Sequence, residues 1–329
     1  MADIIHSHCA GSRDYFLHQG FLPMGTDSFP VFKQFDSGGT QFHELTATVS
    51  SIWAFGFDAV YRIIDGYLCS VWFYKSGAVY FVIQQPRSIT VAASLSPLLD
   101  TLYALALEAG IPKAAPAALQ LWAVDDGLLA DLRQLKTWDV LSEYSEDCSE
   151  YVYRTADIIE WNGGVNLNKR NSLKRCFNTP NVVIRPLTKE NFSHCFVVED
   201  EWCTHQDCEA CRAFAGCLKD SLKNMAEIFD NSIYGGIALY IDDKPAGYAI
   251  WEVMNKTAYI YFAKSNITNF NVYLYYMAAK DYLSGIEYVN NGYDMGKLGL
   301  RTFKKHLSVH ELRRKYLCTL SKREITRAL

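Results

Sequence analysis

The sequence lacks any long apolar run. A helix that crosses a bilayer needs about 18 or more apolar residues in succession, and the best candidate, Ala92–Ile111, is interrupted by Asp100 and Glu108. The first residues also lack the apolar stretch of a secretory signal, because polar and charged residues such as Arg13 and Asp14 stand there. We therefore expect a cytoplasmic protein with no membrane-spanning segment, which leaves peripheral contact with a membrane open.

The sequence also lacks a clear zinc motif, although it contains ten cysteines. Structural zinc sites usually use two pairs of closely spaced cysteines. The run from Cys203 to Cys217 offers one such pair, Cys208 and Cys211. Since we expect no export signal, we expect free thiols rather than disulfides, and we expect no metal site.

A large net charge is absent as well, since the formal value is −4. The charge is nevertheless uneven: residues 297–329 contain ten Lys and Arg against two acidic residues, and so carry +8, which leaves −12 for residues 1–296. A basic segment on an acidic chain is typical of a site for a phosphate-bearing partner. A solvated basic surface explains the pattern equally well, and both interpretations stand.

The length of 329 residues fits two domains of about 150 residues each. We place the first domain at 1–160, a linker with a basic segment at 161–181, and the second domain at 182–329. The basic segment of the linker includes Lys169 and Arg170. Phosphate or RNA contact is one interpretation of this segment, and a solvated surface helix is the other.

Periodicity and turn residues predict a mixed α/β protein. In the second half the predicted order is β-α-α-β-β-β-α-β-α-β, and the first half contains a shorter version of it. The strands of the second half are predicted at 182–187, 236–241, 246–253, 257–263, 286–290 and 315–320, and its later helices at 271–283 and 300–306. In the first half we predict strands at 67–74, 78–84 and 119–124 and helices at 96–110 and 126–135.

The strongest functional signal lies at residues 288–304, where a predicted strand leads through a glycine-containing loop into a basic helix. Glycines let backbone N–H groups approach a ligand, and a helix N-terminus attracts anions. Asp294 can accept a proton or hold a cationic amine, whereas Arg301 and Lys304 share one helix face and can clamp a phosphate. An ordinary strand–loop–helix connection with a solvated basic face is the competing interpretation.

The pattern Asn-x3-Asp-x-Gly-x2-Gly-Leu-Arg-x2-Lys in this segment resembles proteins related to the C-terminal domain of phosphatidylglycerol lysyltransferase. It falls on Asn290, Asp294, Gly296, Gly299, Leu300, Arg301 and Lys304. Further blocks resemble the same family in the same order, namely Glu150–Tyr153, Lys169–Asn171, Lys264 and Lys315–Tyr316.

The resemblance implies a tandem GNAT-like fold, in which each domain is a mixed, mostly antiparallel sheet flanked by helices. It also implies an acyltransferase, because characterised relatives move an amino acid from aminoacyl-tRNA to a lipid, and Fem-type relatives move one to a peptidoglycan precursor. On this basis the candidate catalytic residues are Asp294, Lys264 and Asn290. The candidates for donor or phosphate binding are Arg301, Lys304, Gly296, Gly299, Lys169 and Arg170.

The chain departs from the family pattern at two acidic positions. Ala263 stands where relatives carry Glu before the strand-end lysine, and Asn291-Gly292 replaces an Arg-Glu pair. If those carboxylates are catalytic in relatives, this chain must use Asp294 instead or has lost the reaction. A non-catalytic module that binds a phosphate ligand is therefore a second hypothesis.

The predicted loop after the fourth strand of the second domain, at 264–270, lacks glycine. Acetyl-CoA-using GNAT enzymes, which this domain resembles, hold the donor pyrophosphate on a glycine-rich loop at this place, where backbone N–H groups point at the ligand. The loop therefore favours an aminoacyl-tRNA-like donor and no firmly bound cofactor. Ser265, Asn266 and Thr268 still offer polar groups to a phosphate, which keeps acyl-CoA as an alternative donor.

Overall fold

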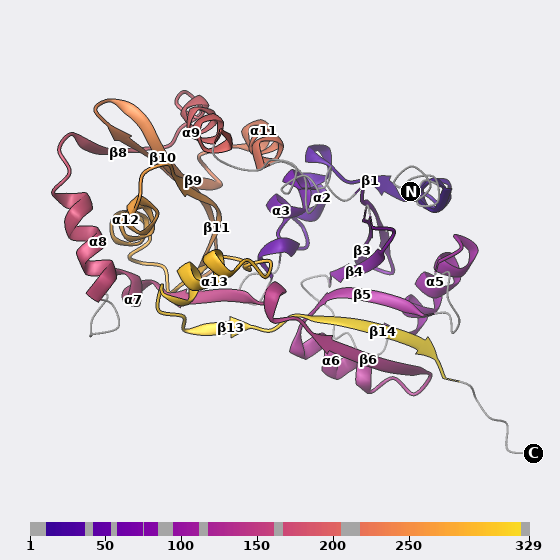
Figure 1. Cartoon of the computed structure of the whole chain (residues 1–329). Helices are drawn as coiled ribbons and strands as arrows, with labels where there is room; N and C mark the ends of the chain where they lie inside the picture. The colour runs from indigo at the N-terminus through magenta and orange to yellow at the C-terminus, as the bar shows by residue number, and fades with distance from the viewer. Residues whose placement is uncertain are drawn as a thin grey trace, which may run out of the picture. The chain divides into compact units, whose positions relative to one another are not determined.

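The computed structural model describes residues 11–36, 42–53, 58–74, 76–84, 95–111, 118–160, 167–204 and 218–323. The chain divides into two units, each made of separate stretches of sequence and each containing a seven-stranded sheet (Figure 1). The first unit comprises Met1–Ser37, Leu45–Glu146 and Arg314–Leu329, and the second comprises Gly38–Glu44 and Asp147–Arg313.

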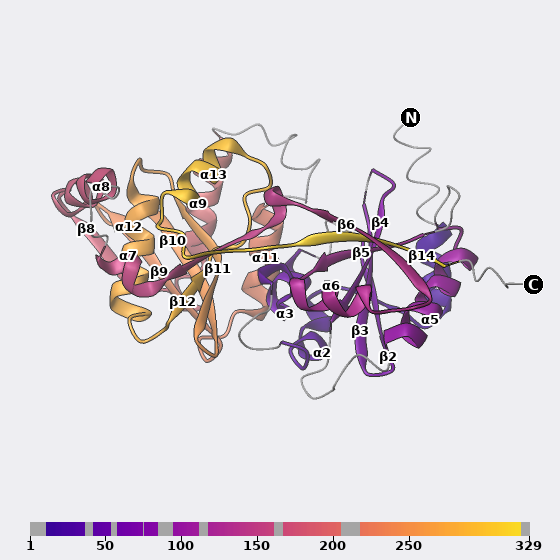
Figure 2. The same ribbon diagram turned by 90° about the horizontal axis from the view of Figure 1, so that it is seen from below.

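The first unit's sheet contains β1 (Leu22–Pro23), β2 (Val60–Ile64), β3 (Tyr67–Phe73), β4 (Val79–Gln84), β5 (Leu119–Val124), β6 (Trp138–Tyr144) and β14 (Tyr316–Lys322). Their order in space is β1-β2-β3-β4-β5-β14-β6. Only β4 and β5 run parallel among these neighbours, and they are paired at Phe81 and Leu121. The last strand of the chain, β14, thus lies between β5 and β6 (Figure 2).

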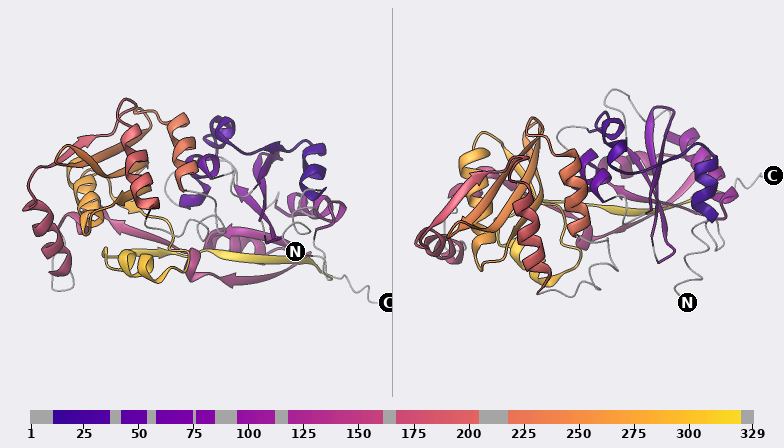
Figure 3. Two further views of the ribbon diagram at one scale, coloured as in Figure 1. Left: turned by 45° about the horizontal axis from the view of Figure 1, so that its top comes forward. Right: turned by 90° about the horizontal axis from the view of Figure 1, so that it is seen from above.

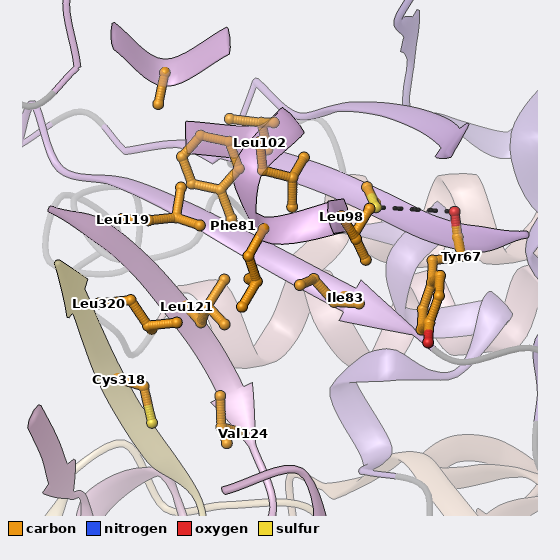
Figure 4. Packing of buried hydrophobic residues seen from close by; sticks show 14 of the residues in the cluster. Tyr67, Phe81, Ile83, Leu98, Leu102, Leu119, Leu121, Val124, Cys318 and Leu320 are labelled. Carbon is orange, nitrogen blue, oxygen red and sulfur yellow. Dashed lines mark hydrogen bonds between the residues drawn. The ribbon is translucent and has the colours of Figure 1, made fainter. Parts of the chain in front are cut away.

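The helices of the first unit cover an apolar core. They include a helical stretch at residues 11–18, η1 (Thr26–Ser28), α2 (Phe29–Phe32), α3 (Ala47–Ile52), α5 (Leu95–Glu108) and α6 (Asp126–Arg133). The short turns η2 (His43–Leu45) and η4 (Glu146–Cys148) lie where the chain passes between units. Helix α6 begins after Asp125, whose carboxylate accepts the Leu128 N–H at 2.7 Å. Leu98 and Leu102 of α5 are fully buried and pack with side chains of β4, β5 and β14 (Figure 4).

The second unit's sheet contains β7 (Glu150–Arg154), β8 (Val182–Pro186), β9 (Tyr234–Ile241), β10 (Lys244–Met254), β11 (Thr257–Ser265), β12 (Tyr288–Asn290) and β13 (Glu311–Arg313). Their order is β13-β7-β12-β11-β10-β9-β8, and only β11 and β12 run parallel among these neighbours. The β9–β10 hairpin turns through Asp242 and Asp243, both with positive φ, as a two-residue turn between right-twisted strands requires.

Helices cover both faces of this second sheet (Figure 1). They are α7 (Thr155–Glu160), α8 (Leu167–Phe177), α9 (Ser193–Cys203), α11 (Leu218–Ile228), α12 (Phe270–Met277), the π-helical turn η6 (Ala278–Tyr282) and α13 (Leu298–Lys305). Trp251 of β10 belongs to the apolar cluster that contains α12, whereas Tyr248 of β10 bonds to Glu199 of α9. Because successive strand residues point to opposite faces, these contacts define an α12 face and an α9 face. Helices α9 and α11 run side by side (Figure 3).

Two irregularities shape the centre of the second sheet. Ile250 pairs with Phe262 and Trp251 pairs with Ile260, so Tyr261 is the extra residue of a β-bulge in β11. Strands β11 and β12 pair only as far as Tyr259 and Asn290, although β11 continues to Ser265. We call the region beyond Tyr259 and Asn290, where β11 is no longer paired with β12, the splay.

The predicted fold class is confirmed, because both sheets are mixed, mostly antiparallel and flanked by helices. The hairpin and helices predicted in the first half, and the strand and helix order predicted from residue 182 to residue 306, match the observed elements within a few residues. In the residues described, no helix is both long and apolar enough to cross a membrane.

The end of the chain differs from the prediction. The strand predicted at 315–320 was expected to close the second domain, but β14 pairs with β5 and β6 of the first unit. The second sheet is completed instead by β7 and β13, which pair with each other. The units therefore divide near 146 and 313 rather than in the 161–181 linker, because strand pairing reaches across the sequence boundaries that we predicted.

Candidate functional site

The segment from β12 to α13 follows a tight path that glycines make accessible. Gly292 and Gly296 have φ values of +60° and +69°, a region that residues with a Cβ rarely adopt. At Gly296 a Cβ would also lie 2.8 Å from the Asp147 carboxylate. Gly299, by contrast, lies inside α13 with open space around it. Of the two glycines predicted to bind a donor, only Gly296 is therefore required by the backbone.

The Asp294 carboxylate is completely buried and lies at the centre of a hydrogen-bond network. It accepts bonds from the Tyr151 hydroxyl at 2.6 Å, from Arg301 Nε at 2.8 Å and from the Gly296 N–H at 2.8 Å. Burial by itself raises the pKa of Asp294, but the bonds from Arg301, Tyr151 and Gly296 outweigh it, so the pKa lies below its ordinary value. Asp294 is thus an ionised residue that holds the loop to β7 and α13.

Arg301 and Lys304 also form hydrogen bonds with the segment from β12 to α13. Arg301 bonds to Asp294 and also to Asp147, and these two carboxylates raise its pKa. Lys304 is nearly buried, and its ammonium donates to the backbone carbonyls of Asn291 and, at 2.7 Å, of Tyr293. In the structure both cations therefore bind the chain itself, and phosphate binding by them stays a prediction.

Asn290 lies in a second network, around the buried carboxylate of Glu150. Its amide donates to Glu150 Oε2 at 2.8 Å, and its side-chain oxygen accepts the Gly292 N–H at 2.9 Å. The same Glu150 oxygen accepts the backbone N–H of His43 at 2.8 Å. Asn290 therefore fastens the start of the loop to β7.

Lys264 belongs to a third group, formed between β11 and α9. Its ammonium donates to Glu199 Oε2 at 2.7 Å and lies 3.6 Å from the centre of the Trp202 ring. Glu199 is fully buried and also accepts the Tyr248 hydroxyl at 2.5 Å. Burial, reinforced by the charge of Glu199, raises the pKa of Tyr248 well above its ordinary value, so this phenol stays protonated and donates. The group holds one cation in a fixed position near the end of β11.

The predicted catalytic residues do not all lie on one face of the sheet. Lys264 pairs directly with Tyr248, so it lies on the α9 face, and Asn290 pairs with Tyr259 on that face. Tyr151, which binds Asp294, belongs to the apolar cluster of the α12 face. The structure thus brings Asp294, Arg301 and Lys304 into one segment and separates them from Lys264, because adjacent strand residues alternate between faces.

The splay contains a histidine that our sequence analysis did not select. His43 Nε2 lies 2.8 Å from the carbonyl oxygen of Ile260 in β11. On the other side, its Nδ1 is 3.3 Å from where a Cβ on Gly292 would lie. The ring centre is 5.2 Å from that of Tyr261. Since 217 residues separate His43 from Ile260, no local pattern could have indicated the contact.

The basic residues of α8 occupy two environments. Lys169 is almost completely buried, and this burial lowers its pKa to about 8, whereas Arg170 is exposed. Helix α8 packs against α12, with Ser172 Oγ donating to Asn269 at 3.0 Å. Their predicted role in phosphate binding stays a prediction, and the burial of Lys169 makes Arg170 the more accessible of the two.

The polar groups of the loop before α12 are bonded within the protein. Ser265 Oγ donates to the Ala246 carbonyl at 2.8 Å, and the Asn266 amide donates to the Val198 carbonyl at 3.0 Å. These bonds occupy groups that we expected to be available to the phosphates of an acyl-CoA.

No cluster of three or more His, Cys, Asp or Glu side chains with metal-binding geometry occurs within the described residues. Of the cysteines considered for zinc, Cys208, Cys211 and Cys217 lie outside them.

Comparison with known proteins connects this arrangement to a family. The model of the family described as phosphatidylglycerol lysyltransferase, C-terminal, matches residues 69–319. No match is found among the curated proteins. A conserved protein of unknown function from Bacteroides thetaiotaomicron has a TM-score of 0.76 at 19% identity, covering 92% of this chain and 99% of that one.

Two further solved structures are similar. The structure titled L-PGS from Bacillus licheniformis has a TM-score of 0.57 at 13% identity, covering 89% of this chain and 90% of that one. FemX has a TM-score of 0.54 at 10% identity, covering 90% and 96%. At these identities the structures establish a shared GNAT-like fold alone. The family model matches well over half of the sequence, and the chain therefore belongs to the phosphatidylglycerol lysyltransferase C-terminal family.

Proposed function

We propose that this protein is an acyltransferase that moves an aminoacyl group from an aminoacyl-tRNA-like donor to an amine or hydroxyl acceptor at the splay of the second unit. The observation that carries the proposal is the splay itself. Strand β11 continues beyond its last pair with β12, Asn290 of β12 bonds to Glu150 of β7 at that point, and Tyr261 of β11 lies beside His43 there. Family membership supports acyl transfer, and the name of the family supports an aminoacyl donor and a lipid acceptor.

In this proposal Lys264 stabilises the negative charge that develops on the acyl carbonyl oxygen. A fixed cation stabilises such an oxyanion best where water is largely excluded, because it needs no reorganisation during the reaction. The Lys264 side chain is 13% exposed, and Glu199 and Trp202 fix its ammonium. We assign Asp294 and Asn290 to positioning the loop, because their hydrogen bonds are made to the protein.

Two features of the loop before α12 support the aminoacyl-tRNA-like donor over acyl-CoA. The loop contains no glycine, and Ser265 and Asn266 bond to backbone carbonyls. A pyrophosphate there would meet few backbone N–H groups that can approach it closely. Acyl-CoA remains the alternative donor.

The test is a transfer assay with the full chain. Total tRNA charged with a labelled amino-acid mixture is one donor, and labelled acetyl-CoA is the other. Phosphatidylglycerol vesicles and a panel of small amines are the acceptors. We expect label transfer from charged tRNA and a loss of about 100-fold in kcat for Lys264→Met, as for removal of an oxyanion-stabilising donor.

Glu199→Gln is the matched variant, because it keeps Lys264 and removes only the charge that fixes it. We expect an intermediate loss in kcat. Transfer from acetyl-CoA alone would replace the proposed donor by the alternative. If the folded protein binds charged tRNA without transferring label from either donor, it is a non-catalytic binding module instead.

A further inference from the structure

Helix α8 has an inner and an outer face. Lys169, Leu173 and Cys176 recur at the spacing of successive helical turns and are buried, and Leu173 and Cys176 belong to the apolar cluster that contains α12. Helix α12 lies between α8 and the sheet in two perpendicular views (Figure 1 and Figure 2). The residues on the other side of α8 therefore face away from the core of the second unit.

The outer face of α8 is basic. Arg170, Lys174 and Arg175 are exposed, and the helix contains no acidic residue. Lys280 in η6, which continues α12, is exposed too, and it is followed by the exposed carboxylate of Asp281. Four cations and one carboxylate give this region a charge of +3, whereas the whole chain carries −4. Such a face attracts an anionic partner.

An apolar ring stands among these cations. Phe177, at the end of α8, is 52% exposed and lies one helical turn after Lys174. Its ring centre is 5.3 Å from that of Tyr273 and 5.9 Å from that of Tyr276, and both pairs of rings are nearly perpendicular. The ammonium of Lys280 lies 5.6 Å from the centre of the Tyr276 ring. The aromatic residues of α12 thus hold Phe177 at the surface, between the cations of α8 and that of η6.

We propose that the outer face of α8, formed by Arg170, Lys174, Arg175 and Phe177, docks the protein on the surface of an anionic lipid bilayer. The cations match the phosphates of the headgroups, and the Phe177 ring enters the boundary between headgroups and acyl chains. Duplex RNA offers phosphates but no apolar layer for an exposed ring, so a lipid surface fits both properties of the face. The inference goes beyond the proposed function, because docking requires no transfer reaction and treats the lipid as a surface.

Co-sedimentation of the full chain with lipid vesicles measures the docking. One set of vesicles is phosphatidylcholine alone, and the other is phosphatidylcholine mixed with phosphatidylglycerol. We expect binding to the mixed vesicles and little binding to phosphatidylcholine, since only the mixed vesicles carry a net negative charge. Binding should weaken steeply with salt, because the Debye length falls from about 10 Å at 0.1 M to about 3 Å at 1 M.

Two variants of α8 separate the contributions of charge and ring. One cation near an anionic bilayer changes the binding constant about fivefold, so we expect Lys174→Gln combined with Arg175→Gln to weaken binding by more than about tenfold. Phe177→Ala should weaken it by about fivefold, because the inserted ring is lost. The matched control combines Lys189→Gln with Lys223→Gln, which removes two exposed cations outside α8 and should have a much smaller effect.

Binding of uncharged total tRNA to the same variants is the second measurement. Vesicle binding that is absent in the wild type, or that the α8 charge variant and the control weaken equally, would overturn the proposal. So would loss of tRNA binding in the charge variant without loss of vesicle binding, which would assign the face to RNA. Unchanged vesicle binding by Phe177→Ala would contradict the lipid surface; should that variant not fold, the charge variant and its control decide. None of these results depends on acyl transfer.

Discussion

The parallel strand pair of the first unit and that of the second unit contain different kinds of side chain. In the first unit β4 and β5 meet at Phe81 and Leu121, both about 1% exposed, which pack with the buried leucines of α5 (Figure 4). In the second unit β11 and β12 part around His43 and Asn290. One sheet arrangement thus serves packing in the first unit and presents polar groups in the second, where we place the chemistry.

The largest loss of stability should come from a substitution in the apolar pair Phe81 and Leu121, where β4 and β5 meet. Phe81→Ala removes a fully buried ring from the first core and leaves a cavity, so we expect the free energy of unfolding to fall by about 3–5 kcal/mol. Urea unfolding followed by tryptophan fluorescence measures it. Leu141→Ala is the control, because Leu141 lies in β6 of the same sheet and is 72% exposed. Equal effects of the two substitutions would contradict the packing role of the first pair.

A smaller, pH-dependent loss of stability should come from a substitution in the hydrogen-bond network around Asp294. The pKa of Asp294 is lowered in the folded state, so its ionised form stabilises the fold above the ordinary value of about 4. This stability is lost as the pH falls through the folded pKa. We expect Asp294→Asn to cost about 2 kcal/mol at pH 7, as for a hydrogen-bonded buried charge, and progressively less below pH 4.

The pH series has its own control in the first unit. Asp139 pairs with Arg323 at 2.9 Å, but both side chains are more than half exposed, and exposed pairs contribute little. Asp139→Asn should therefore change the unfolding curves by less than about 1 kcal/mol at any pH. A cost for Asp294→Asn that does not change between pH 7 and pH 3 would mean that the charge of Asp294 is not what stabilises the loop.

Much of the fold could be predicted from the sequence because its signals are local. The hairpin turn at Asp242-Asp243, the cap at Asp125 and the alternation in β9 to β11 depend on neighbours a few residues away. The pairing of β14 with β5 could not be predicted in this way. The strand β14 is short, and its sequence does not distinguish pairing in the second sheet, where we predicted it, from pairing with β5 and β6 of the first sheet.

The candidate site was predictable in part for the same reason. The motif around Asp294 correctly indicated a glycine-dependent loop joined to a basic helix, but not that Arg301 would be bonded to that carboxylate. Glu199, the partner of Lys264, lies three residues before Trp202 in α9, but nothing local in the sequence indicates which strand this helix meets. His43 carried no signal, because its contacts are entirely non-local.

The smallest changes in stability should come from substitutions of the two glycines predicted to bind a donor, Gly296 and Gly299, and the two changes should have opposite sign. Gly296→Ala forces a Cβ onto a backbone with φ of +69° and to within 2.8 Å of Asp147. We expect a loss of about 1–2 kcal/mol. Gly299→Ala places a methyl group in open space inside α13, where alanine favours the helix, so we expect a gain of about 0.5 kcal/mol. Thermal unfolding of the two variants measures both changes.

The same pair also tests whether either glycine meets a ligand. A methyl group at position 299 meets no other atom within 4 Å, so weaker binding of charged tRNA to a folded Gly299→Ala variant would place the donor against α13. Unchanged binding would leave α13 with the role that its contacts indicate, since Arg301 and Lys304 use its inner side to hold the loop. Weaker binding by Gly296→Ala alone would be ambiguous, because the loop that carries Asp294 must shift to accept the new side chain. Gly299 is therefore the sharper probe, although the effect of its substitution on stability is the smaller one.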